Sequence, residues 1–156
     1  MPQTDQSILV DAPRHRVFDF VADYRNTTKY EKHFSRLDLM PGPARGIVNT
    51  VDVRGWFRGI PVRAKLQIVE FVEDERIVSA SIAGLKSWLE WDFSDEEGKT
   101  RVRLFASYSF PFPFIPRHVR ESIAHEVKSM TTASLIELKR LVERDEAGSV
   151  SEPSAQ

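Results

Sequence analysis

The feature that most constrains this chain is a run of strand-like segments followed by one long helical stripe. Between Leu37 and Phe110, apolar and polar residues alternate in segments that are separated by short turns. A period of two is typical of strands with one buried face, and short connections favour antiparallel neighbours. From about Arg117 to Arg144 the apolar residues recur at steps of three and four, which predicts a helix about 40 Å long. We therefore expect an α+β fold.

Three shorter elements are expected before this run. Ser7 to Val10 has the composition of a short strand. A helix is predicted from Pro13 to Asp23, because Asp11 can cap it and proline is tolerated in a first turn. A second short helical piece is expected from Thr27 to His33, and the strand run follows it. The whole chain would then hold about seven strands, two short helices and one long helix.

The alternation also predicts which side chains face the core. A single sheet with one apolar face needs a cover, and the long helix is the only predicted element large enough, so the sheet should curl around it. The mixture of bulky and small inner residues leaves both a solid core and a cavity open. The expected inner residues of the sheet are Val62, Ala64, Leu66, Ile68, Val78, Ala80, Ile82, Leu89, Trp91, Phe93, Thr100, Val102, Leu104, Ala106, Tyr108 and Phe110, and those of the helix are Val119, Ile123, Val127, Met130, Ser134, Leu138 and Leu141.

Composition excludes several classes of protein. The chain has 156 residues, of which 41% are hydrophobic and 29% charged, and this balance excludes wholesale disorder and a membrane protein. A net charge of -1 gives no basic excess for nucleic acid, and the absence of cysteine excludes disulfides and thiolate chemistry. We expect a cytoplasmic protein with one domain over residues 1–145 and a disordered tail over residues 146–156.

The residues that usually carry catalysis are sparse on the predicted inner surface. His118 and His125 share one face of the long helix, opposite its apolar stripe, so they should be solvated. His33 is the one histidine that we expect could reach a cavity. The chain has no Gly-x-Ser-x-Gly sequence and no phosphate-binding glycine loop. We therefore predict no metal site and no cofactor, assign no catalytic residue, and see no obvious base on the inner face.

A small group of inner residues forms the candidate ligand-binding site. Tyr108 and Asn49 could each present a polar group to a cavity, although a buried phenol more often has a partner in the core. Ser134 is the hydroxyl near the centre of the helix stripe, and it could simply bond back to its own helix. Aromatic and thioether side chains would form the apolar wall. The full set of candidates is Tyr108, Asn49, Trp91, Phe93, Phe57, Met130 and Ser134.

The order of the elements resembles the helix-grip fold of the START-related superfamily. The stretch from Val10 to Tyr24 (VDAPRHRVFDFVADY) is similar to its polyketide cyclase/dehydrase and lipid-transport branch. So is the hairpin that joins Trp91-Asp92-Phe93 to Gly98-Lys99-Thr100-Arg101-Val102. The resemblance spans about Ser7 to Glu143. It implies a curved sheet wrapped around the C-terminal helix, with a cavity for a hydrophobic ligand between them.

The leading functional expectation is the binding of a hydrophobic or amphipathic small molecule. One alternative is an enzyme of the cyclase/dehydratase type, in which Tyr108 or His33 would transfer a proton. Another is a protein-interaction module that uses Arg54, Trp56 and Arg58 on the outer sheet face. The proline-rich segment from Phe110 to Pro116 is expected either to plug the end of the core or to form a flap over the cavity, with membrane contact at most transient.

Overall fold

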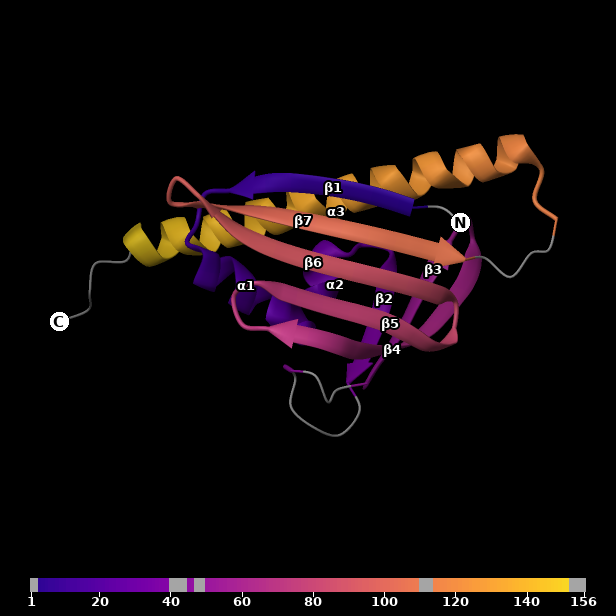
Figure 1. The fold of residues 1–156 in the computed structure, drawn as a ribbon, viewed down its shortest axis with the longest axis horizontal. Coiled ribbons are helices and arrows are strands. Elements are labelled where there is room, and N and C mark those ends of the chain that lie inside the picture. Colours follow the sequence, from indigo (N-terminus) through magenta and orange to yellow (C-terminus); the bar gives the residue numbers. More distant parts are fainter. Residues whose placement is uncertain (1–2, 40–44, 47–49, 110–113, 152–156) are drawn as a thin grey trace.

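The computed structural model describes residues 3–39, 45–46, 50–109 and 114–151 (Figure 1). Seven strands and three α-helices account for most of them. In chain order, the elements are β1 Gln3–Val10, α1 Arg14–Ala22, the 3-10 helix η1 Tyr24–Asn26, α2 Thr27–Tyr30, β2 Phe34–Leu39, β3 Thr50–Phe57, β4 Ile60–Val72, β5 Arg76–Gly84, β6 Lys86–Glu96, β7 Lys99–Ser109 and α3 Arg117–Ser151.

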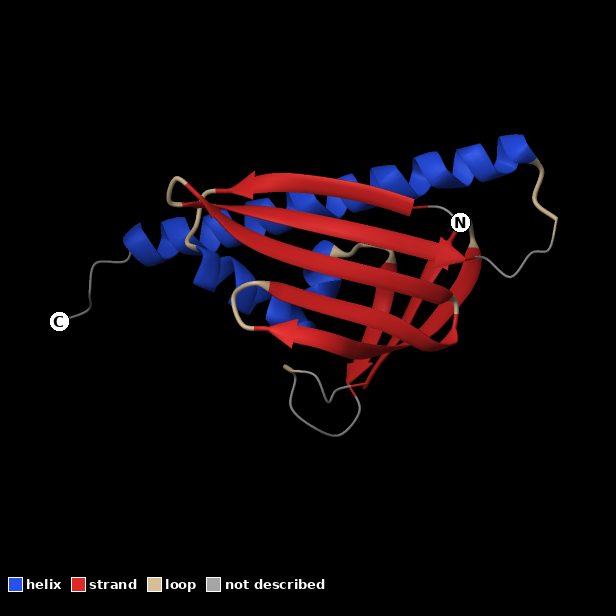
Figure 2. Ribbon diagram, viewed as in Figure 1, coloured by secondary structure: helices blue, strands red, loops and turns tan. Residues whose placement is uncertain are grey.

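The strands form one antiparallel sheet in the order β1-β7-β6-β5-β4-β3-β2. Successive strands from β2 to β7 are neighbours, and β1 returns to pair with β7 at the far edge. The sheet curls, and the helices lie on its concave side (Figure 2). This arrangement confirms the predicted α+β helix-grip fold, with a long C-terminal helix and two short helical pieces after the first strand.

Two elements are longer than the sequence predicts. β1 begins at Gln3 because it pairs along the length of β7, from Gln3 opposite Ser107 to Val10 opposite Thr100. α3 continues to Ser151, and Glu146 near its end forms an ion pair with Arg16 of α1 at 3.2 Å. Residues 146–151 of the predicted tail are therefore helical, and residues 152–156 lie outside the described residues.

The core lies between the concave face of the sheet, α1 and α3. Phe18 of α1 is fully buried, and its ring meets the edges of Phe71 and Phe93 at centroid distances of 5.4 and 5.2 Å. Leu138 of α3 is also fully buried. The buried Thr100 hydroxyl donates to the carbonyl oxygen of Ala12 at 2.8 Å, which ties β7 to the β1–α1 connection. Apolar burial is the dominant stabilising contribution in such a core.

The predicted inner face of β5 is wrong. Ile77 and Ser79 lie opposite Trp91 and Leu89 of β6 and share their inward face, whereas the predicted inner Ile82 is 56% exposed. Because residues 77 and 78 are both apolar, the alternation can be read with either of them facing inward. The serines at 79 and 81 are expected to face solvent, and this assigns Val78, Ala80 and Ile82 to the inner face. The outward residues are Val78, Ala80 and Ile82.

Val78 is nevertheless completely buried, although it points to the outer face. Its neighbours across the strands are Glu70 on β4 and Glu90 on β6. Arg76 donates to Glu70 at 3.1 Å and to Glu90 at 2.7 Å, and also to Asp92 at 2.7 Å. The guanidinium and its carboxylates therefore cover an apolar side chain on the convex face.

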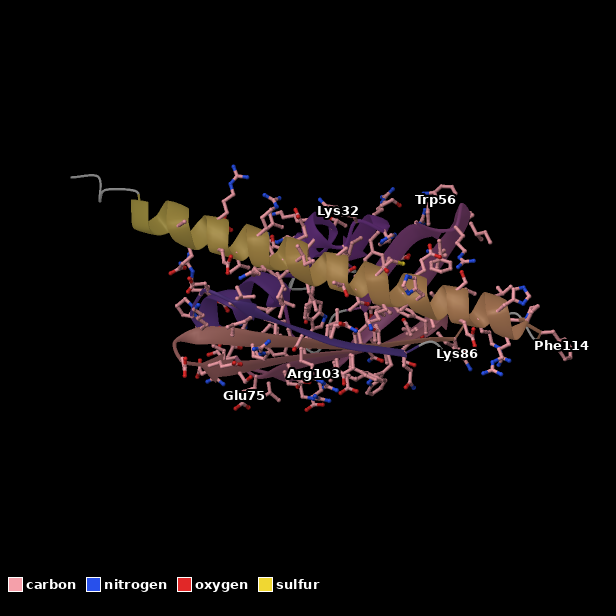
Figure 3. All side chains as sticks on the ribbon, turned by 90° about the horizontal axis from the view of Figure 1, so that it is seen from above. Lys32, Trp56, Glu75, Lys86, Arg103 and Phe114 are labelled. Atoms are coloured by element: carbon pink, nitrogen blue, oxygen red, sulfur yellow. The ribbon has the colours of Figure 1, made fainter. Side chains whose placement is uncertain are left out.

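Several large apolar side chains remain exposed. Trp56 is 57% exposed and Phe114 is 93% exposed, and in Figure 3 both project outward on the half of the molecule where α3 begins. Phe114 therefore does not plug the core, while residues 110–113 of the proline-rich segment lie outside the described residues. Within the described part of the chain, no helix is both long enough and apolar enough to cross a membrane.

Candidate functional site

A pocket opens between the concave sheet face and the middle of α3. Its walls come mainly from β3, β4 and β6, with single residues from β2, β7, the β5–β6 turn and the segment before β2. Phe57 and Tyr108, both predicted site residues, are among them, and Met130 closes it from α3. The full lining of this first pocket is His33, Phe34, Val53, Gly55, Trp56, Phe57, Val62, Ala64, Leu66, Leu85, Ser87, Leu89, Tyr108, Val127 and Met130.

A second pocket adjoins the first and lies nearer to α1, η1 and α2. The two share the side chains of Phe34, Val53, Leu66 and Leu89, so they are neighbouring parts of one region of the concave face. The second contains more polar groups than the first. Its lining is Val21, Tyr24, Thr27, Tyr30, Glu31, Phe34, Leu37, Val51, Val53, Leu66, Ile68, Ile77, Ser79, Leu89 and Trp91.

The wall of the first pocket near β3 depends on a glycine. Gly55 lies against the backbone of His33, and a Cβ atom added to Gly55 would stand 2.2 Å from the His33 carbonyl oxygen. That same oxygen accepts a hydrogen bond from the Trp56 amide at 3.2 Å. The close approach brings the residues before β2 onto β3, and it positions His33 at the pocket.

The predicted site residues divide between the two pockets and the core. Phe57, Met130 and Tyr108 line the first pocket, and Trp91 lines the second. Phe93 lines neither pocket, because it packs between Phe18 and Trp91, with centroid distances of 5.2 and 6.5 Å. Asn49 lies outside the described residues.

The phenol of Tyr108 is held in an apolar environment. Burial, together with the negative charge of Glu31, raises the pKa of the Tyr108 hydroxyl above its ordinary value of 10. No described side chain or backbone group forms a hydrogen bond with this hydroxyl.

Ser134 is buried on α3, but its hydroxyl does not bond back to its own helix. It donates instead to Glu31 Oε2 at 2.8 Å, which links α3 to the residue that directly follows α2. Thr131, one turn earlier, does bond back, to the Val127 carbonyl oxygen at 2.9 Å. The Ser134 hydroxyl therefore stabilises the ionised carboxylate of Glu31 through this hydrogen bond.

Glu31 lines the second pocket and was not among the residues predicted for the site. Burial raises the pKa of its carboxyl group from 4.5 to about 7, although the hydrogen bond from Ser134 acts in the opposite direction. The sequence offered no obvious base on the inner face, and the structure places the carboxyl group of Glu31 in the lining of the second pocket. The sequence signal was limited to position, because Glu31 lies in the second predicted helical piece and Ser134 lies on the inner stripe of the long helix.

The histidines lie largely where they were expected. His118 and His125 are exposed on α3, and His33 lines the first pocket. His15 belongs to the one group in the described part of the chain that has the spacing of metal ligands, together with Asp19 and Asp74. This group is at the surface, outside both pockets, and Arg45 Nη2 donates to Asp19 Oδ1 at 3.0 Å. His15 contacts both carboxylates, at 3.1 Å from Asp19 Oδ2 and 3.3 Å from Asp74 Oδ1.

Residues 1–143 match the family model described as polyketide cyclase/dehydrase and lipid transport. Solved structures agree in fold. A protein from Thermus thermophilus is 20% identical, with a TM-score of 0.81 over 92% of this chain and 99% of its own. The Zhui aromatase/cyclase from Streptomyces is 13% identical, with a TM-score of 0.78 over 91% of this chain and 93% of its own. A START superfamily protein from Mycobacterium smegmatis is 10% identical, with a TM-score of 0.71 over 89% of this chain and 98% of its own.

Proposed function

The chain belongs to the polyketide cyclase/dehydrase and lipid transport family, and from this premise we propose that it binds a hydrophobic or amphipathic small molecule between the sheet and α3. The observation that carries the proposal is the pair of adjoining pockets, whose shared walls are the apolar side chains of Phe34, Val53, Leu66 and Leu89. A concave apolar surface with a few polar groups is the usual form of a small-molecule site. The expected setting is the cytoplasm, with no nucleic-acid partner and at most transient membrane contact.

Binding would be driven by burial of the apolar body of the ligand. Each square ångström of apolar surface removed from water contributes roughly 25 cal/mol. The first pocket supplies aromatic and aliphatic walls, and Tyr108 supplies a hydroxyl that forms no hydrogen bond with any described residue. The phenol would then orient a polar end of the ligand.

The direct test is native mass spectrometry of freshly purified protein, followed by solvent extraction of whatever co-purifies. We expect an added mass that disappears on extraction and that corresponds to a hydrophobic compound. Protein that carries no such compound, and that also fails to take up an uncharged fluorophore such as N-phenylnaphthylamine, would contradict the proposal.

A substitution on α3 tests the position of the site. Met130→Trp places an indole in the first pocket, so we expect the affinity for N-phenylnaphthylamine to fall by about tenfold or more, because the larger side chain displaces the probe. Ser129→Trp adds the same indole on the exposed side of the same helix and serves as the control. Fluorescence titration measures both variants. If the two variants bound N-phenylnaphthylamine with equal affinity, the probe would not occupy the first pocket.

The role of Tyr108 is tested by removal of one oxygen atom. Tyr108→Phe should weaken binding of the extracted ligand by about 1 kcal/mol or more, since one hydrogen bond to the ligand is lost while the ring remains. Isothermal titration calorimetry gives the difference. An unchanged affinity would remove Tyr108 from the contacts with the ligand.

One observation favours a second candidate, an enzyme of the cyclase/dehydratase type. General acid–base catalysis works best with a group whose pKa lies near the working pH, and the pKa of Glu31 in the second pocket is about 7. Tyr108 and His33 line the adjoining pocket. Turnover of a polyketide-like substrate by the wild type, abolished in Glu31→Gln, would support this candidate over simple binding.

A further inference from the structure

Glu31 is the feature of the two pockets that apolar binding leaves unused. Among the described residues that line either pocket, it is the sole carboxylate. It directly follows α2, and a hydrogen bond joins it to the buried face of α3. A carboxylate in an apolar surrounding is costly unless a positive charge or hydrogen-bond donors compensate it. Among the described residues, the Ser134 hydroxyl is the one hydrogen-bond donor to this carboxylate.

The hydrogen bonding of Glu31 leaves one of its oxygens open. Oε2 accepts from the Ser134 hydroxyl at 2.8 Å. Oε1 accepts no hydrogen bond from any described residue. A carboxylate can accept several hydrogen bonds, so the site has room for a donor that the described residues do not supply.

The cationic side chains near Glu31 are directed elsewhere. Lys29 Nζ donates to Asn26 Oδ1 at 2.8 Å. Lys32 is exposed, and its positive charge helps to lower the pKa of Glu137 on α3. Arg140 donates to Glu137 at 2.6 and 3.0 Å. Charged or titratable groups that do face the carboxyl group are the phenols of Tyr30 and Tyr108, while His33 lines the first pocket. No lysine or arginine in the described part of the chain compensates Glu31.

Aromatic rings surround the same pocket. Tyr24, Tyr30 and Trp91 line it together with Glu31, and the rings of Tyr30 and Trp91 meet edge to face with centroids 5.9 Å apart. Aromatic faces attract organic cations, most strongly where water is excluded. An open carboxylate oxygen beside aromatic rings is therefore complementary to an alkylammonium group.

We propose that the ligand is a hydrophobic amine, whose ammonium group pairs with Glu31 in the second pocket while its apolar body occupies the first. This inference rests on the proposed function, because it assigns a chemical class to the molecule bound between the sheet and α3. Phe34, Val53, Leu66 and Leu89 line both pockets, so the two pockets adjoin, and the proposed ligand would extend from the first into the second. A primary or secondary amine that is protonated at neutral pH provides the missing donor and charge.

A pair of matched probes tests the charge. Naphthylethylamine and naphthylethanol share their aromatic body and chain length, and they differ in the terminal group. Calorimetric titration of the wild type should give about tenfold tighter binding of the amine, the scale of a hydrogen bond to a charged partner. Below pH 7, binding of the amine should also release a proton to the solvent, because the carboxyl group of Glu31 loses its proton when it pairs with the ammonium group. Titrations in buffers of different ionisation enthalpy measure that release.

Two variants separate the pocket carboxylate from general loss of negative charge. Glu31→Gln keeps the size of the side chain, and it should bind both probes with similar affinity and without proton release. Glu137→Gln removes a carboxylate from α3 that pairs with Arg140 and lines neither pocket. It should retain the wild-type preference for the amine. Circular dichroism spectra confirm that both variants are folded.

The outcomes distinguish this inference from the proposed function. If the wild type binds both probes equally, and Glu31→Gln changes nothing, then the amine assignment is overturned while binding of a hydrophobic molecule stands. If neither probe binds to the wild type, and N-phenylnaphthylamine also fails, the proposed function falls and the amine assignment falls with it. If both the wild type and Glu31→Gln preferred the amine, the ammonium group would pair with a residue other than Glu31, and the assignment to Glu31 would be overturned.

Discussion

Replacing Phe18 by alanine is expected to lower the free energy of unfolding by about 3–5 kcal/mol, the range for a fully buried phenylalanine. Phe18 has no exposed surface, and its ring contacts the rings of Phe71 on β4 and Phe93 on β6. The substitution would remove the side chain through which α1 holds these two strands. The remaining cavity is lined by rigid aromatic rings, so the structure should collapse around it only in part.

Chemical denaturation in urea measures this loss, with the midpoint and slope fitted together. Phe114→Ala is the matched control, because it removes the same ring from a position that is 93% exposed. Its free energy of unfolding should stay within about 0.5 kcal/mol of the wild type. If Phe18→Ala were as mild as Phe114→Ala, α1 would not be part of the cooperative core.

Glu31→Gln is expected to stabilise the protein above pH 7 and to have little effect near pH 4.5. Burial raises the pKa of this carboxyl group in the folded state to about 7, from 4.5. Between these two values the folded protein holds a proton that the unfolded chain has released. The free energy of unfolding of the wild type therefore falls as the pH rises through this window. Glutamine does not ionise, so the variant avoids a loss of about 3 kcal/mol.

The comparison must be made as a difference between variant and wild type across the window. Other carboxylates, such as Glu90 and Glu143, have lowered pKa values and stabilise the fold as the pH rises. Their contribution is common to both proteins and cancels. Glu137→Gln should show no gain above pH 7, because the pKa of Glu137 is lowered by its hydrogen bond with Arg140. A constant difference between Glu31→Gln and wild type would show that Glu31 is not buried in the folded state.

The fold could be predicted from the sequence because two periodicities, of two and of about 3.6 residues, cover most of the chain. The strands from β3 to β7 and the stripe of α3 follow them closely. β5 is the exception, and its failure has a physical cause. Ser79 faces the second pocket, where a small polar side chain is tolerated, so polarity no longer indicates the outer face. The register of β5 against β4 is also shifted at two places, which no local pattern reveals.

The candidate site could be predicted only in part. Tyr108, Phe57 and Met130 lie on regular elements, so their inward direction followed from spacing, and they line the first pocket. Glu31 follows a one-turn helix, where no periodicity fixes the direction of a side chain. Its hydrogen-bond partner Ser134 is 103 positions away in the sequence. The group with the most unusual chemistry in the pocket was therefore the one that a local pattern could not locate.

The ionic cover over Val78 has a consequence for how the sheet tolerates change. Arg76 spans three neighbouring strands, since its partners Glu70, Glu90 and Asp92 belong to β4 and β6 while it lies on β5 itself. A substitution at Arg76 or at one of its partners changes both the other charges and the cover over Val78. The changes in the free energy of unfolding from two such substitutions should therefore not be additive. On this convex surface, Glu70, Arg76, Glu90 and Asp92 therefore form one coupled unit rather than four independent surface charges.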